Sequence, residues 1–245
     1  MDETIDKRLI KLRTQIEAAR QEFDMAVLFH EVWKPMAYDD SLHARMGASL
    51  ASNAFSIIKV ALRREMLLAL GRVWDPVNGA PQLERAAHVL NDKKIRDQVL
   101  ADRVTHAKRI KGAERLPPMF WEKLKEELDV AAVTVISILE KWSRGGSQNA
   151  ARERFKALRN QFLAHRQVEL SVSDGDGLSD QEVEEYFSDT SKLIELLLNL
   201  CLAVSYNPAD TGDTYRRAAE LFWAGVRGEK TEGHPNFIAS SPDRC

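Results

Sequence analysis

Apolar residues recur at helical spacing along most of the chain, which predicts an all-α protein. Between Pro118 and Gly145 they fall every three or four residues over about six turns, so they line one face of a helix. A similar face is formed by Leu62, Met66, Ala69 and Val73. We expect helices over 3–33, 41–75, 118–143, 148–166, 180–205 and about 210–227, with one or two shorter helices over 81–111.

Prolines and a capping pattern predict where several of these helices begin and end. The first helix should stop before Pro35 and the second at Asp75, because proline lacks a backbone donor and disfavours helical backbone in the residue before it. Ser179 and Glu182 have the spacing of a capping box that opens the helix 180–205. Residues 168–172 alternate as in a strand, but five residues cannot form a sheet alone. The predicted architecture is an all-α bundle of long antiparallel helices, whose core is formed by 41–75, 118–143, 148–166 and 180–205.

The composition fits one soluble globular domain followed by a short tail. The chain has 245 residues, of which 44% are hydrophobic and 29% are charged, and its net charge is −2. We expect one domain over 1–228 and a loose, polar tail over 229–245. Cys201 and Cys245 do not suggest a disulfide framework, and no segment resembles a secretion signal or a membrane span. These features predict a cytoplasmic protein without a membrane partner.

Charge is distributed unevenly between two neighbouring segments. Residues 144–166 contain six basic residues and one acidic residue, whereas 169–213 contains eleven acidic residues and one basic residue. One interpretation is that the two helices attract each other or lie on solvated faces. The other is that the basic helix forms part of an anion-binding surface, because clustered Lys and Arg side chains are what phosphate recognition requires.

Most common functional motifs are missing from the chain. There is no P-loop, no GxGxxG and no nucleophile elbow. The acidic turn at 173–182 lacks the ligand spacing of a calcium loop, and the histidines outside 159–166 lack the spacing of a zinc site. We therefore expect neither a cofactor nor a metal.

The segment RNQFLAHR, residues 159–166, carries the one remaining constellation of reactive side chains. On a regular helix Arg159 and His165 are separated by about 9 Å of rise and about 120° of rotation, so they do not share a face. His165 continues the apolar face of Leu158 and Phe162, whereas Arg159 falls in a basic stripe with Arg152, Lys156 and Arg166. If the apolar face formed a dimer interface, a two-fold axis could bring both copies of the two residues around one cleft.

Such a cleft would suit phosphodiester cleavage without a metal. Histidine can move a proton near neutral pH, and arginine can hold the phosphoryl oxygens. Asn160 could orient a hydroxyl group or the histidine. The structural alternative is an ordinary helix end, where cations favour the C-terminal dipole.

The stretch LRNQFLAHR resembles the signature of the HEPN superfamily, in which a polar residue follows an arginine and a histidine comes four to six positions after that arginine. Arg159, Asn160 and His165 match this pattern, and LALGRVWDP (68–76) is similar to an earlier helix of abortive-infection HEPN proteins. The resemblance covers about 41–205. It departs at Gln167, where HEPN toxins silenced by a nucleotidyltransferase carry tyrosine, and at 81–111, which looks like a helical insertion.

The resemblance implies a bundle that dimerises through the motif helix and a metal-independent endoribonuclease that cuts transfer or messenger RNA as a toxin or phage-defence effector. Arg159 and His165 would be catalytic with Asn160 assisting, and Arg72 and Asp75 would support them. The basic residues expected to bind RNA are Arg152, Lys156 and Arg166. An antitoxin protein is a further candidate partner. The alternatives are a non-catalytic HEPN module that binds RNA or protein, and a helical scaffold with an accidental motif.

Overall fold

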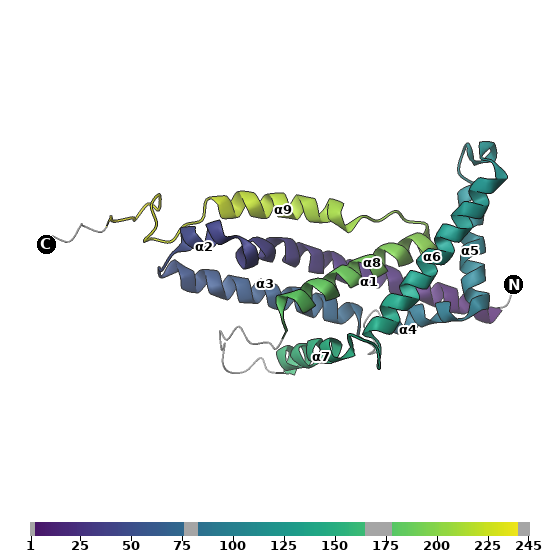
Figure 1. Ribbon diagram of the computed structural model, residues 1–245, viewed down its shortest axis with the longest axis horizontal. Helices are drawn as coiled ribbons and strands as arrows, with labels where there is room; N and C mark the ends of the chain where they lie inside the picture. Colours follow the sequence, from purple (N-terminus) through teal and green to yellow (C-terminus); the bar gives the residue numbers. More distant parts are fainter. Residues whose placement is uncertain (1–2, 76–82, 165–177, 240–245) are drawn as a thin grey trace. The chain divides into compact units, whose positions relative to one another are not determined.

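The structure is a computed structural model that describes residues 3–75, 83–164 and 178–239 (Figure 1). Helices and short turns make up all of the regular structure in these ranges, which confirms the all-α prediction. The predicted strand-like segment 168–172 lies outside the described residues. The α-helices are α1 (Glu3–Tyr38), α2 (Asp40–Met46), α3 (Ala51–Val73), α4 (Leu83–Ala87), α5 (Lys93–Lys108), α6 (Pro118–Trp142), α7 (Asn149–Ala164), α8 (Asp180–Leu202) and α9 (Pro208–Ala224). Two 3₁₀ turns, η1 (His88–Asn91) and η2 (Ala113–Arg115), flank α5.

The chain divides into two compact units, and α1 and α3 contribute to both. Of the described residues, the first unit comprises 3–23, 69–75, 83–164 and 178–208, and the second comprises 24–68 and 209–239. None of the described helices combines the length and the apolar character that a bilayer-spanning segment needs.

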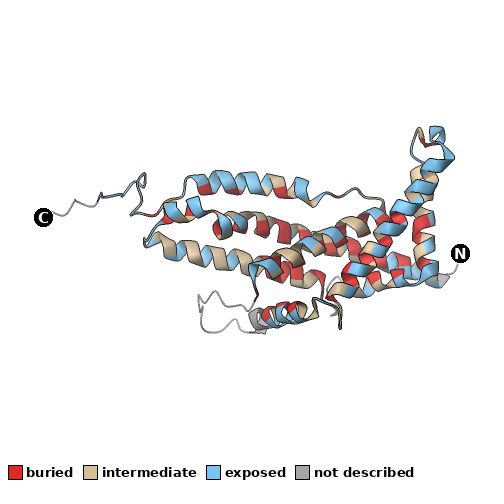
Figure 2. Ribbon diagram, in the orientation of Figure 1, coloured by how far each residue is buried: buried red, intermediate tan, exposed pale blue. Residues whose placement is uncertain are grey.

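In the first unit, α6 packs against α8 and the two run in opposite directions (Figure 1). The expected apolar stripe of α6 is buried from Leu128 to Trp142, whereas its first turns are exposed (Figure 2). Helix α8 begins with the predicted capping box: the Glu182 N–H donates to Ser179 Oγ, and the Glu182 carboxylate accepts from the Ser179 N–H at 2.9 Å. Helix α7 follows α6 after a short turn.

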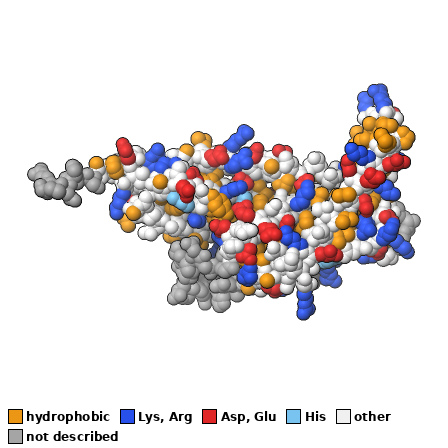
Figure 3. All heavy atoms as spheres, in the orientation of Figure 1, with side chains coloured by type: hydrophobic (Ala, Val, Ile, Leu, Met, Phe, Trp, Pro, Cys, Tyr) orange, Lys and Arg blue, Asp and Glu red, His pale blue; other side chains and the backbone are white. Residues whose placement is uncertain are grey.

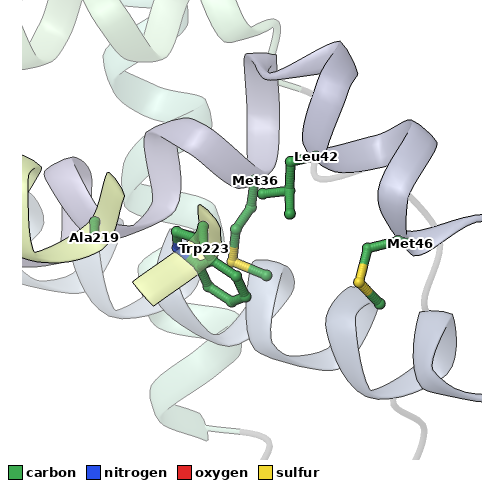
Figure 4. Close-up of a cluster of buried hydrophobic side chains, with 5 residues drawn as sticks. All are labelled: Met36, Leu42, Met46, Ala219 and Trp223. Carbon is green, nitrogen blue, oxygen red and sulfur yellow. The ribbon is translucent and has the colours of Figure 1, made fainter. Parts of the chain in front are cut away.

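In the second unit, apolar side chains from α1, α2 and α9 form a small core (Figure 4). Trp223 of α9 is buried in this core, and its indole Nε1 donates to the Val32 carbonyl of α1 at 3.3 Å. The ring of Phe55 in α3 meets Trp223 edge-on, with the centroids 5.7 Å apart. The buried members of this cluster are Met36, Leu42, Met46, Ala219 and Trp223.

The prediction that the first helix stops before Pro35 is wrong, because α1 continues through Pro35 to Tyr38. A proline inside a helix costs about 3 kcal/mol. Trp33 and Met36 on either side are completely buried, and burial of large apolar side chains of this kind contributes about 1.5–3 kcal/mol each. Tertiary packing therefore outweighs the local cost of the proline.

The predicted helix 41–75 is in fact two helices, α2 and α3, separated at Gly47. Gly47 has a φ of +56°, which glycine adopts without the strain that a side chain would add. The start of α3 is capped from far along the chain: the Glu229 carboxylate accepts the backbone N–H groups of Leu50 and Ala51. A helix break held by a distant residue leaves no local pattern in the sequence.

Candidate functional site

Arg159 on α7 reaches the segment that follows α3. Its Nη1 lies 2.7 Å from Oδ2 of Asp75, and only 11% and 15% of the two side chains are exposed. The Asn160 side-chain oxygen accepts from Arg159 Nη2 at 2.9 Å and from Nε at 3.3 Å. The structure thus brings together three of the predicted site residues. His165, predicted as the proton-transfer group, lies outside the described residues.

Gly71 gives the stem of Arg159 the room to lie against α3. A Cβ atom added at Gly71 would be 3.1 Å from Cδ of Arg159, closer than ordinary van der Waals contact. This role of Gly71 was not predicted from the sequence. The signal was present as a single glycine within a helical pattern, which often marks a close approach of another segment.

The RVWD run at 72–75 makes three different contacts within the first unit. Arg72 Nε donates to Glu22 of α1 at 2.7 Å, so this predicted supporting residue anchors α3 to α1. Trp74 Nε1 donates to the buried Thr190 hydroxyl of α8 at 2.9 Å, and that hydroxyl donates to the Tyr186 carbonyl at 2.7 Å. With Asp75 bound to Arg159, the run connects α3 to three other helices.

A cluster of four aromatic rings holds α7 against α6 and α8. Tyr186 of α8 lies at its centre, with ring centroids 4.2 Å from Phe155 of α7, 4.7 Å from Trp142 of α6 and 5.7 Å from Trp74. Burial raises the pKa of the Tyr186 phenol far above its ordinary value, so the ring is neutral at any working pH. The cluster therefore acts through packing, and it fixes the helix that carries Arg159.

The predicted basic stripe on α7 is only partly open to a ligand. Arg152 is ion-paired with Glu84 of α4, donates to the Trp142 carbonyl at 2.9 Å and is 16% exposed. Lys156 is 48% exposed, and a Glu153 carboxylate oxygen lies 3.7 Å from its Nζ. Arg166, the third expected RNA-binding residue, lies outside the described residues.

Opposite charges on α8 neutralise several basic residues of its neighbours. Arg154 of α7 is ion-paired with Glu182, and Lys141 of α6 lies 2.7 Å from Glu185 and 2.5 Å from Asp189. Burial alone would lower the pKa of Lys141, but its hydrogen bonds to the two carboxylates raise it. The uneven charge of the sequence is therefore explained in part by attraction between adjacent helices.

A cavity of about 360 Å³ lies where the ends of α5 and α8 approach α1. Arg13 donates to the Cys201 carbonyl at 3.1 Å and to Asp102 at 3.3 Å, and Arg103 donates to the Asn199 carbonyl at 3.0 Å. These arginines satisfy the last carbonyls of α8, as expected for cations at a helix C-terminus. Burial raises the pKa of the Cys201 thiol to about 12, so the wall of the cavity contains a thiol and not a thiolate.

A comparison with known proteins matches residues 3–222 to a HEPN family described as AbiU2. The match covers both the motif helix and the RVWD run, and it extends beyond the segment for which the sequence suggested a resemblance. No curated protein matches the chain, and neither does any solved structure. The predicted resemblance to abortive-infection HEPN proteins is confirmed.

Proposed function

The chain belongs to the HEPN AbiU2 family of abortive-infection proteins, and from this premise we propose that it is a metal-independent endoribonuclease that acts as a toxin or phage-defence effector. The observation that carries the proposal is the placement of Arg159 on the motif helix, where Asp75 and Asn160 hold its guanidinium group. A guanidinium held in advance stabilises charge on a phosphoryl group without the cost of ordering a free side chain.

In the proposed reaction, His165 removes the proton from a ribose 2′-hydroxyl group of the RNA. The 2′-oxygen then attacks the adjacent phosphorus, and the bond between phosphorus and the 5′-oxygen breaks. An imidazolium gives a proton to the departing 5′-oxygen, so the products are a 2′,3′-cyclic phosphate and a 5′-hydroxyl. Arg159 would hold the non-bridging oxygens, on which negative charge increases.

Two copies of the motif helix would supply a proton acceptor and a proton donor to one cleft. On a regular helix Arg159 and His165 point about 120° apart, so one copy alone would not surround a phosphate. We therefore propose a homodimer formed through α7, with cytoplasmic RNA as its substrate and an antitoxin protein as a candidate partner. Light scattering on the purified protein tests the dimer.

The RNA backbone would be contacted by the exposed part of the basic stripe. Lys156 is exposed enough to contact RNA. RNA binding by Arg166 stays a prediction from the sequence. Arg152 would have to leave Glu84 and the Trp142 carbonyl before it could bind a phosphate, so its larger contribution would be to fix α7.

The proposal is tested by cleavage of transfer RNA and messenger RNA in the presence of a metal chelator. Wild type should leave 2′,3′-cyclic phosphate ends, whereas Arg159→Ala and His165→Ala should remove cleavage and host growth arrest while folding and dimerisation persist. Lys93→Ala is a matched control, because Lys93 is a highly exposed cation on α5. If wild type cuts no RNA with or without metal and its expression is harmless, the proposal is wrong.

The second candidate function is a non-catalytic module that binds RNA or a protein. The same ion pair favours it, because Asp75 already neutralises the charge of Arg159. In that case Arg159→Ala would weaken binding of the partner, but no RNA end with a cyclic phosphate would form.

A further inference from the structure

The end of the α5–α6 pair carries an exposed cluster of basic and apolar side chains, which we call the α5–α6 tip (residues 108–120). Figure 3 shows basic and hydrophobic side chains gathered at this end. The basic members are Lys108, Arg109, Lys111 and Arg115, and the large exposed apolar members are Ile110, Leu116, Met119 and Phe120. Successive turns connect them, with hydrogen bonds from Ala113 N to the Ile110 carbonyl and from Phe120 N to the Pro117 carbonyl.

The basic side chains of the tip are free to bind an anion. Within the described ranges no carboxylate lies within ion-pair distance of any of the four. Glu114, the single acidic residue of the tip, uses its carboxylate to accept the Gly112 N–H at 3.0 Å. Farther along the same two helices several cations have a carboxylate partner, as in Lys93 with Asp97 at 2.6 Å and Lys123 with Glu127 at 3.9 Å.

Aromatic rings lie among these charges. Phe120 is 41% exposed and meets Trp121 edge-on with the centroids 5.1 Å apart, and Lys108 Nζ lies 5.3 Å from the centre of the Trp121 ring. Proteins that bind single-stranded nucleic acid combine unpaired cations for the backbone with exposed rings on which bases stack. A second copy of the chain fits this surface poorly, because a symmetric contact would place like charges together.

We propose that the α5–α6 tip is a second RNA-binding surface, which selects RNA long enough to contact both the tip and the motif helix. This inference rests on the proposed function for its choice of ligand. Helix α6 begins at the tip and ends at Trp142, whose carbonyl binds Arg152 of α7. Its 25 residues span about 37 Å, so a dinucleotide at the cleavage site would not reach the tip, whereas a transfer RNA would.

The test measures binding of transfer RNA to the cleavage-defective His165→Ala protein at several salt concentrations. Adding Arg109→Gln and Lys111→Gln should weaken binding roughly thirtyfold at low salt and make the salt dependence shallower, because two phosphate contacts are lost. Adding Phe120→Ala should weaken binding roughly tenfold without changing the salt dependence. The control pair Lys93→Gln and Lys94→Gln removes the same charge from the other end of α5 and should leave the affinity unchanged.

A second measurement separates this inference from the proposed function. With otherwise wild-type protein, the tip variants should slow cleavage of transfer RNA and leave cleavage of a dinucleotide unchanged. If RNA is cut but the tip variants bind and cut it normally, the tip inference is wrong and the ribonuclease stands. If no RNA is cut but the tip variants still weaken RNA binding, the tip inference stands without the ribonuclease. If the tip variants bind anionic lipid vesicles more weakly than wild type but bind RNA with unchanged affinity, the tip inference is wrong and the tip binds a membrane surface instead.

Discussion

Gly71 of α3 faces Arg159 of α7 so closely that a methyl group added there would lie 3.1 Å from Cδ of the arginine. Because Asp75 holds the far end of the arginine, the stem cannot move away without shifting the guanidinium. Gly71→Ala should therefore slow RNA cleavage at least tenfold, since small displacements of a catalytic group have large effects on rate. Alanine in place of glycine stabilises the helix by about 1 kcal/mol, which offsets the energetic cost of displacing the Arg159 stem. The Tm of Gly71→Ala should therefore differ from that of wild type by no more than about 3 °C.

The control for this variant is Gly212→Ala in α9. A Cβ atom there would lie 3.5 Å from the Glu31 carboxylate, which is ordinary contact, so Tm should be maintained or raised and cleavage unchanged. Wild-type cleavage by Gly71→Ala, measured with the same RNA, would show that the stem of Arg159 tolerates the shift.

Asp75 is expected to act as a positioning residue for Arg159. Asp75→Asn keeps the shape of the side chain and removes its charge, so kcat should fall about 10- to 100-fold while KM changes little. The nearly buried pair should also contribute about 1–3 kcal/mol to the free energy of unfolding, measured in urea.

Asp213→Asn provides a matched control in an exposed pair, where Asp213 lies 2.7 Å from Arg216 and the effect on stability should be below about 1 kcal/mol. An increase of kcat in Asp75→Asn would contradict the positioning role and show instead that Asp75 masks the arginine.

Local patterns predicted the helices around the site closely. The expected segments 118–143, 148–166 and 180–205 correspond to α6, α7 and α8, because amphipathic spacing, the stretch between Pro118 and Gly145 and a capping box are all local signals. The contacts that build the site are not local. Arg152 and Glu84 are 68 positions apart, and no periodicity in the sequence relates the two. Glu84 also lies in the segment 81–111, which the sequence marked only as a helical insertion, and its carboxylate is ion-paired with Arg152 of the motif helix.

The aromatic cluster behind α7 should determine both stability and the placement of the motif helix. Phe155 is 5% exposed and its ring is stacked on Tyr186, so Phe155→Ala should lower the free energy of unfolding by about 3–5 kcal/mol. Phe222→Ala, at a position that is 64% exposed, should cost less than about 1 kcal/mol. Equal urea midpoints for the two variants would mean that Phe155 does not hold α7 in place.

Glu229 should make the second unit sensitive to acid. Hydrogen bonds from the N–H groups of Leu50, Glu229 itself and Ala51 lower the pKa of this carboxyl from 4.5 to about 2. A carboxyl whose pKa is lower in the folded state stabilises the fold above its ordinary pKa, and this contribution is lost as the pH falls from about 4.5 to about 2.

Glu229→Gln should therefore lower the Tm at pH 7, and the difference in Tm from wild type should disappear as the pH falls through that range. Glu232→Gln is the control, because Glu232 is an exposed acidic residue close to Glu229 in the sequence, and the Tm of this variant should follow that of wild type at every pH. A Glu229→Gln difference that persisted unchanged at pH 2 would exclude ionisation of Glu229 as the cause.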